Sequence, residues 1–103
     1  MKRIAMKIPK TVKIGAKTFS VSFNDPVSQD MSTDGYINYG QQKIVLRNHL
    51  LNKERQEQAF IHEITHAIDD SFCIKDSGEK LTESEVERLS SSFYQIVKEN
   101  KIF

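Results

Sequence analysis

The chain is poor in cysteine, tryptophan, proline and glycine. Its 103 residues include one cysteine, no tryptophan, two prolines and four glycines. The single cysteine, Cys73, closes no intrachain disulfide and makes no zinc ribbon or finger, so we expect a reducing, cytoplasmic setting. No apolar run reaches the roughly 20 residues of a membrane helix, and lysines interrupt the start of the chain, so we expect neither membrane insertion nor secretion.

The composition is that of one globular domain spanning residues 1–103. Hydrophobic residues make up 38% of the chain and charged residues 28%, with a net charge of +1. The charge is uneven, because residues 1–17 hold six lysines or arginines and no acid. Such a segment can attract nucleic acid, but lysines that alternate with Val12 and Ile14 also fit the solvent face of a strand, which we favour.

The front half of the sequence alternates between apolar and polar residues with a period of two. This pattern predicts a β-hairpin over residues 11–23 with its turn at 15–17. Two further short strands are expected at residues 36–39 and 43–47, joined by a turn. We therefore expect a small antiparallel β-sheet.

The rear half changes to helical spacing. Apolar residues recur every three or four positions over residues 53–70, with Asn52 as N-cap, and again over residues 83–100. The expected fold class is α+β, with a small antiparallel β-sheet followed by two helices.

The first predicted helix contains two histidines, His62 and His66, four residues apart. They share one helical face, nearly opposite the apolar stripe, so both imidazoles can reach one metal ion. Glu63 projects beside them and can take a proton from a metal-bound water. The alternative is a solvent-facing histidine pair in a domain without metal.

A catalytic zinc site needs a third protein ligand, and the second predicted helix begins with three acids. Relative to its apolar stripe, Glu85 lies at about 70°, Glu83 at about 90° and Glu87 at about 130°. Glu85 is the favoured ligand, with Glu83 left open. Glu85 equally fits a capping box with Thr82 as N-cap.

Two segments resemble a known class of enzymes. Residues 62–67, HEITHA, resemble the active-site helix of zincin metallopeptidases, and a glutamate ligand on the next helix is the gluzincin arrangement. Residues 83–90, ESEVERLS, are similar to the second helix of ImmA/IrrE-like metallopeptidases. Over residues 35–100 the chain also resembles small phage-encoded metallopeptidase-like proteins and, more loosely, SprT-like domains.

The resemblance implies zinc-dependent hydrolysis of a peptide bond in a protein or peptide substrate. His62, His66 and Glu85 would bind Zn²⁺, and Glu63 would be the general base. An edge strand beside the active helix would bind substrate by strand addition, which points to residues 36–39 or 43–47.

Two further roles stay open. During hydrolysis, negative charge would develop on the oxygen of the substrate carbonyl. Zinc would stabilise this oxyanion, either alone or together with a phenol, for which Tyr36, Tyr39 and Tyr94 are candidates. The alternative function is a catalytically inactive, zinc-stabilised binding module that contacts nucleic acid through its basic N-terminal lobe. We expect no membrane partner, and the oligomeric state is not set by the sequence.

Overall fold

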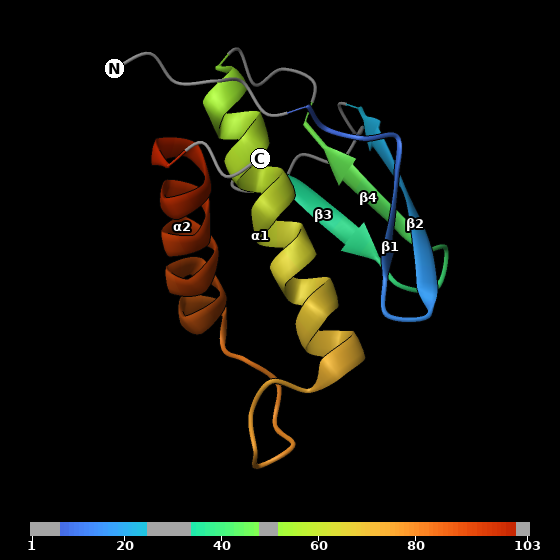
Figure 1. Cartoon of the computed structure of the whole chain (residues 1–103). Helices are drawn as coiled ribbons and strands as arrows, with labels where there is room; N and C mark the ends of the chain where they lie inside the picture. The colour runs from blue at the N-terminus through green and yellow to red at the C-terminus, as the bar shows by residue number, and fades with distance from the viewer. Residues whose placement is uncertain (1–6, 25–33, 48–51, 101–103) are drawn as a thin grey trace.

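The computed structural model describes residues 7–24, 34–47 and 52–100 and arranges them as a sheet followed by two helices (Figure 1). The expected α+β fold class is confirmed. In chain order the described elements are β1 (Thr11–Ile14), β2 (Lys17–Phe23), β3 (Gly35–Asn38), β4 (Lys43–Leu46), α1 (Lys53–Phe72) and α2 (Glu83–Glu99). The first six residues, which belong to the basic segment, lie outside the described residues.

The sheet is mixed, which corrects the expectation of a wholly antiparallel sheet. Its strand order is β1-β2-β4-β3, and β2 pairs with β4 in parallel, while the outer pairs are antiparallel. β2 and β4 are the interior strands, and β4 carries the uninterrupted apolar run Ile44, Val45 and Leu46, all three of which are buried. Such a run is typical of an interior strand. β3 is left at the edge of the sheet.

α1 packs across one face of the sheet and forms the centre of the molecule (Figure 1). Asn52 caps its start, since the Asn52 side chain accepts the backbone N–H of Glu54 at 2.8 Å. The core between helix and sheet consists of Ile14, Phe19, Ile44, Leu46, Ala59, Phe60, Ile61 and Ala67, joined by Tyr94 of α2. With its apolar face buried in this way, α1 turns its histidine face away from the core.

α2 packs against α1 on the side away from the sheet (Figure 1). Asp69, near the end of α1, is buried and accepts the backbone N–H groups of Leu81 at 2.9 Å and Ile74 at 3.4 Å. These contacts hold the connection between the helices and so place the start of α2 against the middle of α1. Neither helix described here is both long and apolar enough to cross a membrane.

Candidate metal centre

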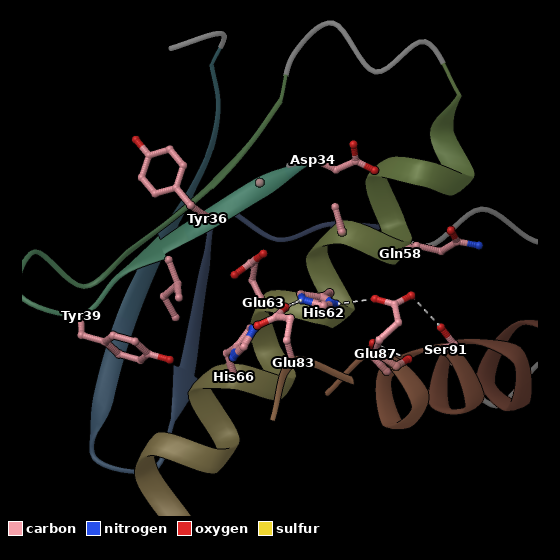
Figure 2. Close-up of a pocket in the computed structure, with 14 residues that line it drawn as sticks. Asp34, Tyr36, Tyr39, Gln58, His62, Glu63, His66, Glu83, Glu87 and Ser91 are labelled. Carbon is pink, nitrogen blue, oxygen red and sulfur yellow. Dashed lines mark hydrogen bonds and ion pairs between the residues drawn. The ribbon is translucent and has the colours of Figure 1, made fainter. Parts of the chain in front are cut away.

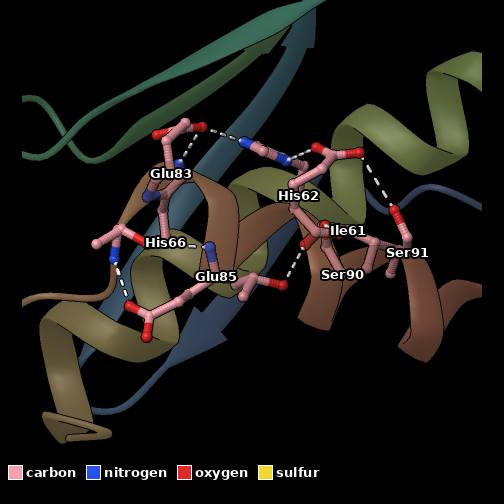
Figure 3. A network of polar contacts seen from close by, with 10 residues as sticks. Ile61, His62, His66, Glu83, Glu85, Ser90 and Ser91 are labelled. Atoms are coloured by element: carbon pink, nitrogen blue, oxygen red, sulfur yellow. Dashed lines mark hydrogen bonds and ion pairs between the residues drawn. The ribbon is translucent and has the colours of Figure 1, made fainter.

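The side chains of His62, His66 and Glu83 converge where α1 faces the first turn of α2 (Figure 3). The Nε2 atoms of His62 and His66 lie 2.8 and 3.2 Å from the same Glu83 oxygen, Oε1. One ligand atom from each residue lies within 4.8 Å of the others, so the group is suited to hold a metal ion. We call these three residues the triad.

Both ring nitrogens of His62 face a carboxylate. Nε2 faces Glu83, and Nδ1 lies 3.0 Å from Oε2 of Glu87. A neutral imidazole carries one N–H and donates from one nitrogen only. When both carboxylates are ionised, the arrangement is satisfied by a protonated ring or by a cation at one of the two nitrogens. A metal ion at Nε2, with Nδ1–H donated to Glu87, satisfies both sides of the ring and matches how metal-binding histidines are oriented in proteins.

The structure does not bring Glu85 to the histidines, in contrast to the sequence expectation. One Glu85 oxygen accepts the backbone N–H of Thr82 at 2.8 Å, and Thr82 Oγ1 accepts the backbone N–H of Glu85 at 3.1 Å, which forms the capping box. Lys75 Nζ lies 2.9 Å from the same carboxylate. The Thr82 N–H and the Lys75 ammonium lower the pKa of Glu85 to about 2. Glu83, two residues earlier, has the place expected for Glu85.

The triad opens into a cleft between the edge of the sheet and the two helices (Figure 2). The cleft has a volume of about 680 Å³. Its walls are formed by Asp34, Gly35, Tyr36, Ile37 and Tyr39 from the β3 segment, Gln58, Ala59, His62, Glu63 and His66 from α1, and Glu83, Glu87, Ser90 and Ser91 from α2. Arg55 of α1 binds both carboxylate oxygens of Asp34, at 2.7 and 2.8 Å, which ties the start of β3 to α1.

Two carboxylates in the cleft have pKa values shifted in opposite directions. Burial raises the pKa of Glu63, and the electrostatic attraction of the neighbouring His62 and His66 side chains lowers it in part. Desolvation also raises the pKa of Glu83, but hydrogen bonds to the two histidines outweigh it, and the net pKa is lowered. The lowered pKa favours the ionised form of Glu83, which is the form that binds a metal ion. The raised pKa means that Glu63 takes up a proton more readily than Glu83 does.

The three tyrosines have different places. Figure 2 shows the hydroxyl of Tyr39 directed into the cleft and the ring of Tyr36 directed away from it. Tyr94 is buried between the helices and donates to Glu57 at 2.7 Å. Burial, together with the charge of Asp70 and other carboxylates, raises the pKa of Tyr39 to about 12. Tyr39 is thus a phenol that remains a proton donor at neutral pH.

Glu87 is the site residue that reasoning from the sequence missed. It was placed farthest from the apolar stripe among the three acids, yet it contacts His62 directly. A signal for it was present, because Glu83 and Glu87 are four residues apart and so share a helix face, as His62 and His66 do. His49, the remaining histidine, lies outside the described residues.

Comparisons with models of protein families, with curated proteins and with solved structures each gave no match. The assignment of function therefore rests on the residues and the geometry of the cleft.

Proposed function

We propose that this protein is a zinc-dependent metallopeptidase in which His62, His66 and Glu83 bind the metal and Glu63 is the general base. One observation carries the proposal. Two imidazole nitrogens and a carboxylate converge in an open cleft, with the second, buried carboxylate of Glu63 next to them in the chain and in space.

The donor set suits zinc. Two histidines and one glutamate form the ligand set of zinc hydrolases that keep a fourth position open for water. Ligand atoms around a tetrahedral zinc ion lie about 3.3 Å apart, given metal–ligand distances of about 2.0–2.1 Å. The two separations between a histidine nitrogen and Glu83 Oε1, 2.8 and 3.2 Å, lie within about 0.5 Å of this value. When bound, zinc supplies a water of lowered pKa and polarises the substrate carbonyl.

Glu63 is suited to move the proton of the hydrolysis. It follows His62 directly, and its carboxylate lies on the sheet side of the two histidines (Figure 2). Glu63 accepts a proton from the attacking water as the water oxygen bonds to the carbonyl carbon. It then delivers that proton to the amide nitrogen as the C–N bond breaks, which leaves a new carboxyl end and a new amino end.

The edge strand β3 provides a binding surface for an extended peptide. Of the two strands considered from the sequence, β4 is interior and β3 is at the edge, where it lines the cleft. A peptide that pairs with β3 would pass the triad and Glu63 with its scissile carbonyl exposed to both. Tyr39, directly after β3, would donate a hydrogen bond to the carbonyl oxygen as negative charge develops there.

Cleavage of an unfolded protein tests the proposal. Zinc-loaded protein is incubated with casein, and new peptide ends are identified by mass spectrometry. We expect cleavage by the natural chain and a loss of at least about 100-fold in Glu63→Gln, with zinc content unchanged. Glu54→Gln, an acid-to-amide change in the first turn of the same helix, should retain the activity.

Two results would contradict the proposal. Cleavage that persists in Glu63→Gln would remove Glu63 from the chemistry. Absence of cleavage by the zinc-loaded natural chain, across unfolded proteins and peptide libraries, would favour the alternative of a zinc-stabilised binding module.

A further inference from the structure

Three large apolar side chains form a stripe on the outer surface of α2. Leu89, Phe93 and Ile96 are 45%, 55% and 48% exposed. Their spacing of four and three residues places them within an arc of about 60° and along about 10 Å of the helix. We call these three residues the α2 stripe.

About half of the surface of the α2 stripe stays open to solvent in the described part of the chain. Within the described part of the chain, α2 packs against α1 and against no strand. Val86 and Val97 are buried, whereas the α2 stripe lies beside them and is open to solvent. The apolar sector of α2 is therefore wider than the surface that α1 covers. Contiguous exposed apolar side chains of this kind mark interaction sites.

Charges of opposite sign flank the two ends of the stripe. Arg88 lies at the N-terminal end and Glu99 at the C-terminal end, both on the flank of α2 away from α1. The midpoint between them falls next to Phe93. When two α2 helices lie antiparallel with their Phe93 side chains in contact, Arg88 of each copy is level with Glu99 of the other. The same surface then pairs apolar side chains with apolar side chains and is complementary to itself in charge.

We infer that the α2 stripe is the contact surface between two copies of this chain, which pair through antiparallel α2 helices about a twofold axis. One helix pair makes an interface at the small end of the known range, so the dimer fraction rises with protein concentration. Glu83 and Glu87 lie on the other flank of α2, and the cleft stays open in the dimer.

Sedimentation equilibrium of the full chain, from micromolar to millimolar concentration, tests the inference. We expect a monomer–dimer equilibrium in which Phe93→Lys raises the dissociation constant by about tenfold or more. The matched control is Phe72→Lys, which changes a phenylalanine at the end of α1 that is 61% exposed and lies outside the stripe. A natural chain that stays monomeric at millimolar concentration, or equal effects of the two substitutions, would overturn the inference.

A charge exchange tests the antiparallel arrangement separately. Arg88→Glu places two acids opposite each other and should weaken the dimer, while the addition of Glu99→Arg should restore it. Circular dichroism checks the fold of each variant, and we expect all of them to be folded because all these side chains are exposed. Failure of the double exchange to restore association would overturn the antiparallel pairing. Zinc content should be the same in all these variants, so this test is independent of the proposed function.

Discussion

Glu87 contacts the ring nitrogen of His62 that faces away from Glu83, and so is placed to orient the ring. One Glu87 oxygen lies 3.0 Å from Nδ1 of His62, and the other accepts the Ser91 hydroxyl at 3.2 Å. The carboxylate is held at both ends, and the ring that contacts it is held with it. A residue that orients a ligand in this way affects how tightly the metal binds without touching it.

We predict that Glu87→Gln lowers the affinity for zinc by about 10- to 100-fold, because the amide is a weaker acceptor for the Nδ1 proton. Competition with a chromophoric chelator measures this affinity. Glu79→Gln, an acid-to-amide change in the exposed connection between the helices, is the control and should leave the affinity unchanged. An unchanged affinity in Glu87→Gln would show that the contact does not orient the ring.

Single residues also show where reasoning from the sequence stops. The spacing of His62 and His66 predicts that their side chains share a face, and they do. Glu83 and Glu85 differ by about 200° around the helix, so they lie on opposite flanks of the apolar face at similar angles from its centre. Which flank meets the histidines depends on how α2 crosses α1. That crossing is a property of the packed pair and not of either helix alone.

The two helices are joined by a buried ion pair. Lys98 Nζ lies 2.8 Å from Glu57 Oε1, and the two side chains are 3% and 2% exposed. The Tyr94 hydroxyl donates to the same oxygen. Removal of the Lys98 ammonium leaves the buried Glu57 carboxylate without that opposite charge, which costs more than the pair itself contributes.

We therefore predict that Lys98→Met lowers the free energy of unfolding by about 3 kcal/mol. Urea denaturation followed by circular dichroism measures the change. Lys80→Met is the control, because Lys80 pairs with Asp70 at the surface and its loss should have little effect. Equal stabilities of the two variants would mean that the buried pair does not hold α2 to α1.

The capping box of α2 makes stability depend on pH in the acid range. The pKa of Glu85 is about 2 in the folded chain against an ordinary value of 4.5. A lowered pKa in the folded state stabilises the protein above pH 4.5, and this contribution is lost as the pH falls through about 2. The stability difference between the natural chain and Glu85→Gln should therefore shrink between these two pH values. A difference that is constant with pH, measured by urea denaturation, would contradict this account.

The elements themselves follow closely from the sequence. Alternation places the hairpin of β1 and β2, and helical spacing places α1 and α2 to within two residues at each end. The parallel pairing of β2 with β4 could not be predicted from the sequence, because β3 and two connections separate these strands along the chain. The sequence does contain one local sign that β4 is interior, which is the uninterrupted apolar run from Ile44 to Leu46.

On the scale of the whole molecule, charge is divided between the layers. The described segments 7–24 and 35–47, which hold the sheet, contain lysines and one arginine but no acid. Three acids of the two helices, Glu63, Glu83 and Glu87, line the cleft. Asp34, which directly precedes β3 and pairs with Arg55, lines it as well. This concentration of negative charge in one hollow favours a bound cation. The cleft was not predictable from the sequence, because its walls come from three elements brought together by folding.

Zinc content per chain is the most direct test of the central claim, which is that Glu83 and the two histidines form the metal site. Protein purified without chelators is analysed by elemental mass spectrometry beside Glu83→Ala and Glu85→Ala prepared in the same way. The account predicts about one zinc per natural chain, a large loss in Glu83→Ala and retention in Glu85→Ala. No zinc in the natural chain after zinc is supplied, or loss in Glu85→Ala with retention in Glu83→Ala, would contradict it.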